Sequence, residues 1–154
     1  MSCSHWQVRQ PLLEDIVSRG TDSENFFKIP NGVDASRFLP QGKDDDLLDK
    51  YGLRNCTVLG FIGTFFDIEG LDCLVRAMQK IAERLRSVRL LLVGGGEEEH
   101  AIQRLSTELG LSDKVIFPGR VAHAAILKYY SIMDVLIYPR IRNRVTDLVT
   151  PLKP

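Results

Sequence analysis

Three arginines separated by single residues, Arg140, Arg142 and Arg144, follow a short apolar stretch near the end of the 154-residue sequence. The guanidinium group presents parallel N–H donors that match phosphate oxygens, so a cluster of this kind beyond a strand would suit a diphosphate. The same pattern also describes a solvated basic loop, whose charges would interact only weakly. Both interpretations stay open on these residues alone. Lys153 adds a further cation to the same stretch.

Two glycine-containing turns are the other candidates for ligand contact. Gly63 and Thr64 follow the apolar run 58–62, and the triplet Gly94 to Gly96 follows the run 89–93. Backbone amides at strand-to-helix turns can bind an anion. The triplet lacks the third glycine of a dinucleotide fingerprint, because Glu99 stands there, which argues against a nicotinamide-dependent oxidoreductase. Since three glutamates follow Gly96 directly, the sequence favours a tight turn with close ligand approach over a phosphate cradle.

Other reactive side chains give no signal for a metal site or a covalent nucleophile. His5, His100 and His123 are scattered, and no metal-ligand or nucleophile motif occurs. Cys56 and Cys73 are expected to be small buried apolar residues, and three cysteines without a metal spacing suit a reducing cytoplasm.

Three carboxylates lie beside the first glycine turn. Asp67, Glu69 and Asp72 flank the predicted start of a helix, where acidic residues are common. We therefore expect a solvated or helix-capping role for them.

Apolar runs of strand length alternate with helical patterns, which predicts an α/β fold with a parallel sheet covered by helices on both faces. The first strand should neighbour the second and the fourth, placing the ligand site at its carboxyl end. After Pro139 the pattern stops and a loop is predicted. The sheet strands are expected at 58–62, 89–93, 114–117 and 135–138, the main helices at 71–85, 97–109 and about 123–133, and shorter elements at 8–19 (helix), 26–29 (strand) and 47–51 (helix).

The composition fits a globular domain and argues against a nucleic-acid binder and against a membrane-spanning chain. The chain is 44% hydrophobic and 26% charged, with 20 basic and 20 acidic residues that cancel. This balance argues against a general nucleic-acid binder. No apolar run approaches the ~18 residues of a membrane span, and the first ten residues lack the apolar core of a signal peptide.

The segment Ile29-Pro30-Asn31-Gly32-Val33-Asp34, followed by Phe38 and Pro40, resembles the interdomain junction of family 4 glycosyltransferases of GT-B architecture. Later segments resemble the same family in the same order. These are Phe61-Ile62-Gly63, Glu69-Gly70 with Leu74, Leu91-Leu92-Val93-Gly94-Gly95-Gly96, Val115-Ile116-Phe117-Pro118-Gly119-Arg120-Val121, Tyr129-Tyr130 and Asp134-Val135 to Pro139. Each motif is weak alone, but the ordered set is specific.

The resemblance implies a Rossmann-like domain that binds a nucleotide diphosphate sugar, as one half of a GT-B enzyme. Such enzymes transfer a sugar to an acceptor hydroxyl, usually with retention and without a metal. Carried over by position, Gly63 and Thr64 would face the donor diphosphate, with Gly94 and Gly96 nearby. The backbone of Arg120 and Val121 would meet the base.

Two departures from the family pattern qualify this interpretation. The family commonly has Arg after the first glycine and Lys before the second, but Thr64 and Glu69 stand there. We therefore expect Arg142, Arg144 or Lys153 to supply the missing charge. The family's ribose-binding glutamate would lie past Pro154, so the resemblance implies residues 1–34 as a remnant of the preceding domain and 35–154 as a truncated donor domain.

These features lead to one main expectation and one alternative. The chain is expected to be the donor-binding part of a cytoplasmic glycosyltransferase whose acceptor, a glycan or lipid, binds through an N-terminal domain absent from the sequence. Peripheral membrane association of the whole protein and self-association of this chain, through apolar residues near Leu136, are also expected. The alternative is a non-catalytic nucleotide-binding or partner module that kept the fold, which the loss of both family cations would favour.

Overall fold

The computed structural model describes residues 6–7, 10–27, 39 and 41–148. The chain divides into two compact units, one of residues 36–141 and one that combines residues 1–35 with 142–154. Among the described residues, no helix has the length and apolar character needed to cross a membrane.

The larger unit is built on a four-stranded sheet in the order β5-β4-β3-β6, with every adjacent pair parallel. This confirms the predicted sheet and the central place of β3 between the second and fourth strands. The strands are β3 (Thr57–Thr64), β4 (Val88–Gly95), β5 (Val115–Gly119) and β6 (Val135–Leu136). The last strand is shorter than predicted, since Pro139 has no N–H to extend the ladder.

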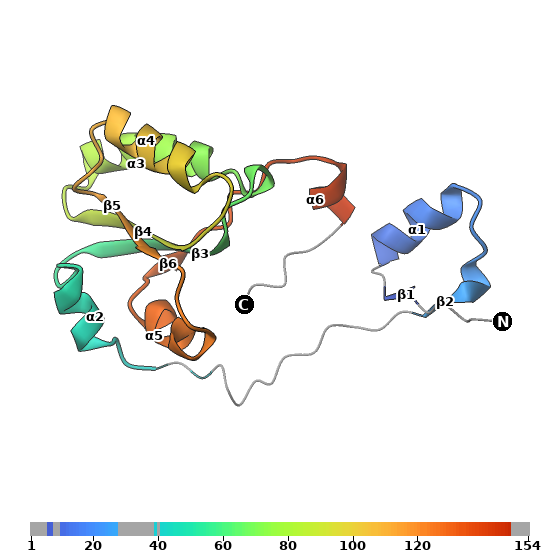
Figure 1. Cartoon of the computed structure of the whole chain (residues 1–154), viewed down its shortest axis with the longest axis horizontal. Coiled ribbons are helices and arrows are strands. Elements are labelled where there is room, and N and C mark those ends of the chain that lie inside the picture. Colours follow the sequence, from blue (N-terminus) through green and yellow to red (C-terminus); the bar gives the residue numbers. More distant parts are fainter. Residues whose placement is uncertain (1–5, 8–9, 28–38, 40, 149–154) are drawn as a thin grey trace. The chain divides into compact units, whose positions relative to one another are not determined.

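Helices cover both faces of this sheet, as predicted (Figure 1). One face packs against α3 (Leu71–Arg84) and α4 (Glu99–Glu108), and the other against α2 (Asp45–Lys50) and α5 (Ile126–Ser131). Strand residues alternate between two cores because successive side chains point to opposite faces. Phe61, Leu90 and Leu92 lie in the first core, and Val58, Ile62, Leu91 and Val93 lie in the second.

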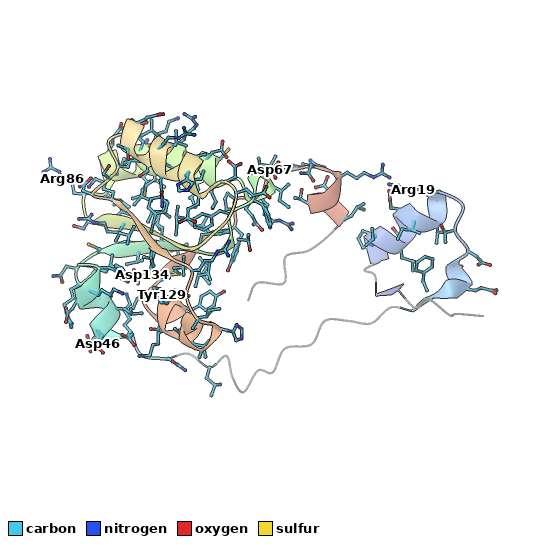
Figure 2. All side chains as sticks on the ribbon, viewed as in Figure 1. Arg19, Asp46, Asp67, Arg86, Tyr129 and Asp134 are labelled. Atoms are coloured by element: carbon cyan, nitrogen blue, oxygen red, sulfur yellow. The ribbon has the colours of Figure 1, made fainter. Side chains whose placement is uncertain are left out.

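Asp134 attaches the edge strand to the centre of the sheet. Its backbone N–H donates to the Val58 carbonyl at 2.8 Å, and its Oδ2 accepts from the Val58 N–H at 2.8 Å. Its Oδ1 pairs with Lys43 at 2.6 Å. Figure 2 shows Asp134 and Tyr129 on the side of the sheet that carries α2 and α5.

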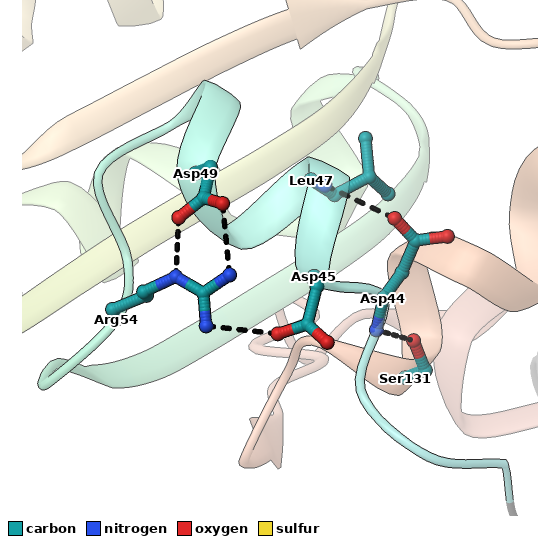
Figure 3. Close-up of polar contacts among 6 residues, drawn as sticks. All are labelled: Asp44, Asp45, Leu47, Asp49, Arg54 and Ser131. Carbon is teal, nitrogen blue, oxygen red and sulfur yellow. Dashed lines mark hydrogen bonds and ion pairs between the residues drawn. The ribbon is translucent and has the colours of Figure 1, made fainter.

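Acidic residues cap the start of α2 and pair along it. Asp44 accepts from the Leu47 N–H at 3.0 Å, while its own N–H donates to Ser131 Oγ at 3.1 Å (Figure 3). Arg54 bridges Asp45 and Asp49 on the exposed side of the helix. The cluster is structural, because Asp44 caps the helix and Asp45 and Asp49 form ion pairs with Arg54.

Three details of the larger unit correct the sequence-based expectations. Cys73 is exposed and Cys56 is only half-buried. The helix predicted to end at Leu85 ends one residue earlier, and Leu85 is 54% exposed. The predicted third helix splits into the 3₁₀ turn η3 (His123–Ala125) and the shorter α5.

The smaller unit contains the parallel pair β1 (Trp6–Gln7) and β2 (Phe26–Phe27), the helix α1 (Gln10–Ser18) and the 3₁₀ turn η1 (Ser23–Asn25). It also contains α6 (Arg144–Leu148), where a loop was predicted. Asn143 explains the difference: its Oδ1 accepts from the Thr146 N–H, and its own N–H donates to Thr146 Oγ1, each at 2.9 Å. This reciprocal cap stabilises a helix that has little apolar periodicity.

Candidate site at the carboxyl edge of the sheet

The carboxyl ends of the parallel strands meet at one edge of the larger unit, where ligands bind in open α/β sheets. Figure 2 shows Asp67, in the 3₁₀ turn η2 (Asp67–Glu69) after β3, at the opposite end of the sheet from Arg86, which precedes β4. Gly63 and Thr64 end β3, and in the strand register they lie beside Gly94 and Gly95 of β4. The first two predicted contact segments are therefore neighbours.

The glycine triplet lets the loops after β3 and β4 cross without side chains. A Cβ built on Gly94 would lie 1.8 Å from the Gly63 carbonyl oxygen, and one on Gly96 would lie 2.6 Å from the Phe65 carbonyl oxygen. Two backbone hydrogen bonds fix the crossing, from the Phe65 N–H to the Gly95 oxygen and from the Glu98 N–H to the Phe65 oxygen, both at 3.1 Å. A close approach was predicted at Gly94 and Gly96, and in the structure the backbone of Gly63 and Phe65 makes it.

Arg120 brings a cation to the same edge. It follows β5 and is exposed. A Cβ built on Gly95 would lie 3.3 Å from the Arg120 Nε and 2.6 Å from the Glu99 Oε2, so both side chains lie over Gly95. Val121 is half-buried and packs against the second core. The structure therefore brings together the predicted residues Gly63, Thr64, Gly94, Gly96, Arg120 and Val121.

Three further cations were predicted to bind the donor, namely Arg142, Arg144 and Lys153. Arg142 and Arg144 belong to the smaller unit, where they pair with Asp147 at 3.4 Å and with Asp15. The hydrogen bond from Arg144 holds the pKa of the Asp15 carboxyl below its usual value. Lys153 lies outside the described residues.

A second group of polar residues lies at this edge. None of its members belongs to the predicted set of donor-binding residues. Glu69, expected to be solvated or helix-capping, is 8% exposed, so a solvated role is wrong for it, whereas Asp67 and Asp72 are exposed. Burial raises the pKa of the Tyr138 phenol far above its usual value, and a hydrogen bond with Tyr130 and the charge of Glu69 act in the same direction.

Arg140 completes this polar group. It directly follows Pro139 and is half-buried, and its Nε is fully enclosed. The Ile141 N–H donates to the Ile68 oxygen at 2.9 Å, so the segment after β6 lies against the segment that carries Glu69. A sequence signal was present for Arg140, because it follows an apolar run directly, but the burial of Glu69 depends on this long-range contact.

Among the residues that the structure describes, no three His, Cys, Asp or Glu side chains are grouped so as to hold a metal ion. The geometry instead offers a glycine-built loop crossing with arginines at its border. Such an edge can bind an anionic ligand through backbone amides and guanidinium groups.

Comparison with known families identifies the larger unit. The sequence model described as "Glycosyl transferases group 1" matches residues 45–144. The chain belongs to the group 1 glycosyl transferases. The match spans the whole four-stranded sheet and the loops at its carboxyl edge.

Curated relatives of this group 1 glycosyl transferase chain carry transferase names. It is 29% identical over 115 residues to the GDP-mannose-dependent alpha-(1-6)-phosphatidylinositol monomannoside mannosyltransferase of Mycolicibacterium smegmatis, covering 72% of this chain and 29% of that protein. It is 33% identical over 145 residues to an uncharacterized glycosyltransferase of Methanocaldococcus jannaschii, covering 91% of this chain and 37% of the relative. The chain therefore spans about a third of the length of these relatives.

Solved structures confirm the Rossmann-like α/β fold within the GT-B architecture. Anabaena HepE in complex with UDP and glucose matches 87% of this chain and 37% of its own, with a TM-score of 0.73 and 21% identity. Sucrose-phosphate synthase from Thermosynechococcus elongatus matches 88% of this chain and 35% of its own, with a TM-score of 0.69 and 28% identity.

Proposed function

We propose that this chain is the donor-binding part of a family 4 glycosyltransferase that transfers a hexosyl group from a nucleotide diphosphate sugar to an acceptor hydroxyl, with retention and without a metal. The observation that carries the proposal is the family match over residues 45–144, which covers the sheet edge where the glycine loops cross. A departing nucleoside diphosphate is stabilised by donors fixed in advance at such an edge.

The names of the relatives support a nucleoside diphosphate as the ligand. One relative is described as GDP-mannose-dependent, and HepE was solved with UDP and with UDP-glucose. The transferase names also favour this function over a non-catalytic nucleotide-binding module. Gly63 and Thr64 would face the diphosphate, and Arg120 and Val121 the base, with Arg142, Arg144 and Lys153 as further proposed cations.

Nucleotide binding by the full chain tests the proposal. Isothermal titration calorimetry should detect GDP or UDP binding, with affinity for the nucleoside at least about tenfold weaker, because charge-assisted hydrogen bonds to phosphate contribute about 1.5–3 kcal/mol each. The affinity should be unchanged by EDTA. Absence of heat with both diphosphates, confirmed by a folded circular dichroism spectrum, would contradict the proposal.

The acceptor side of the reaction is proposed from the same family. The acceptor would be a glycan or a lipid held by an N-terminal domain, with peripheral membrane association of the whole protein in the cytoplasm. The mycobacterial relatives, whose names include a phosphatidylinositol mannoside, support a lipid-linked acceptor.

Self-association of this chain is the remaining proposed interaction. Val135 and Leu136 on the edge strand β6 are 48% and 39% exposed, which matches the predicted apolar edge. An unpaired parallel edge with exposed apolar side chains is an association site. Light scattering should show mass rising with concentration, and Leu136→Lys should suppress the rise, whereas Leu85→Lys at an exposed helix end should not. A concentration-independent monomer would contradict this proposal.

A further inference from the structure

The loops after the four strands of the larger unit carry few cations for a diphosphate. The loop after β3 contributes Asp67 and Glu69, and the loop after β4 contributes Glu97 and Glu98. In the described segments 65–70, 96–98, 120–122 and 137–141, the basic residues are Arg120 and Arg140. An anion at this edge of the sheet would therefore meet acidic loops unless these two arginines offset them.

Arg140 is fixed at the edge by backbone contacts. A Cβ on Gly70 would lie 3.4 Å from Ile141 Cγ1 and 3.6 Å from the Arg140 nitrogen, so the two segments pack backbone to backbone. Gly70 has φ +67° and is the N-cap of α3, so the turn at Glu69 and Gly70 lies against the start of the Arg140 segment. The hydrogen bond from the Ile141 N–H to the Ile68 oxygen closes this contact.

Glu69 and Arg140 carry opposite charges on these two adjoining segments. Glu69 is 8% exposed with Oε2 enclosed, and the Arg140 Nε is enclosed as well. A buried carboxylate is costly unless a cation and hydrogen bonds compensate it. Arg140 is the cation on the adjoining segment. A guanidinium carries several N–H donors, so one such group can contact a carboxylate and a phosphate at the same time.

We propose that Arg140 binds the diphosphate of the donor and that Glu69 is a positioning residue that orients its guanidinium. The inference rests on the proposed function and adds a residue to its site. Arg142 and Arg144 differ from Arg140, because they belong to the smaller unit and pair with carboxylates there.

Calorimetric titration of the full chain with GDP and UDP, and with guanosine and uridine, tests the role of Arg140. Arg140→Gln should weaken binding of the preferred diphosphate by about 10- to 100-fold, with nucleoside binding unchanged. Arg140→Lys should recover part of the loss, since it restores the charge but not the planar fork. The matched control is Arg104→Gln, an exposed arginine of α4, which should leave both affinities unchanged.

Glu69→Gln distinguishes positioning from a general charge effect. In the wild-type background it should weaken diphosphate binding, because Arg140 loses the carboxylate that orients it. In the Arg140→Gln background it should strengthen binding, because it then removes only a repulsive charge. This change of sign is not expected of a residue that merely supports the fold.

Each outcome has a defined meaning. Diphosphate binding by the wild type that is unchanged in Arg140→Gln would overturn this inference and leave the proposed function standing. The same sign for Glu69→Gln in both backgrounds would overturn the positioning role of Glu69. Failure of the folded wild type to bind either diphosphate would overturn the proposed function and this inference with it. Thermal unfolding of each variant by circular dichroism verifies that the folded state is being compared.

Discussion

Gly94→Ala is expected to destabilise the larger unit by about 4 kcal/mol or more, which is at the upper end for single substitutions. The new Cβ would lie 1.8 Å from the Gly63 carbonyl oxygen and 3.2 Å from Phe65 Cε1. The backbone cannot yield easily, because Gly63 and Gly94 are paired in the β3–β4 ladder. The φ of +136° adds strain for any residue with a Cβ. Urea unfolding followed by circular dichroism measures the effect.

Two other glycines separate the contributions to this cost. Gly110→Ala has φ +68° but nothing within 4 Å of the new Cβ, so it should cost only the backbone strain of about 1 kcal/mol. Gly42→Ala has neither positive φ nor a close neighbour and should change the free energy of unfolding by less than about 0.5 kcal/mol. If Gly94→Ala costs no more than Gly110→Ala, the tight crossing of the two loops does not exist in solution.

Phe61→Ala is the second substitution with a large expected effect, about 3–5 kcal/mol of unfolding free energy. Phe61 is fully buried in β3, with ring centroids 6.0 Å from Phe65 and 5.8 Å from Tyr138. The substitution would open a cavity between the β3 loop and the segment after β6. Since folded domains are stable by only about 5–15 kcal/mol, a large share of the stability would be lost.

Phe66→Ala is the matched control for this prediction. Phe66 is 43% exposed and lies next to Phe65 in the same loop. Its removal should cost less than about 1 kcal/mol, because most of the hydrophobic contribution comes from area taken out of water. Equal midpoints of urea unfolding for the two variants would show that Phe61 does not lie in a packed core.

The sheet was predictable because its signals are local. Each strand is an apolar run, and the α3 pattern of Leu71, Leu74, Val75 and Met78 marks one buried face. The same pattern should have placed Cys73 outside, since it falls between the buried positions. The helix α6 was missed because its signal is a cap, at Asn143 and Thr146, and not an apolar period.

The candidate site was predictable only in part. The switch-point rule placed Gly63 and Thr64 at the ligand edge. Gly94 was predicted from the glycine triplet that follows a strand, and Arg120 only from the family resemblance. The burial of Glu69 was not accessible, because it depends on the segment after Pro139 lying against Ile68 and Gly70, far away in sequence. Likewise, the spacing of three arginines gives no sign that Arg140 belongs to one compact unit and Arg142 and Arg144 to the other.

The attachment of β6 through Asp134 has a consequence for biosynthesis. Val58 and its partner Asp134 are 76 residues apart, and β6 is the last of the four described strands of the sheet to leave the ribosome. At translation rates of about 5–20 residues per second, one edge of β3 waits roughly 4–15 s for its own partner. During that interval the nascent chain exposes the edge of a parallel sheet formed by β3, β4 and β5, which is a template for pairing between neighbouring nascent chains. The yield of folded protein should therefore depend on translation speed and on chaperones that shield β3 until the residues around Asp134 emerge.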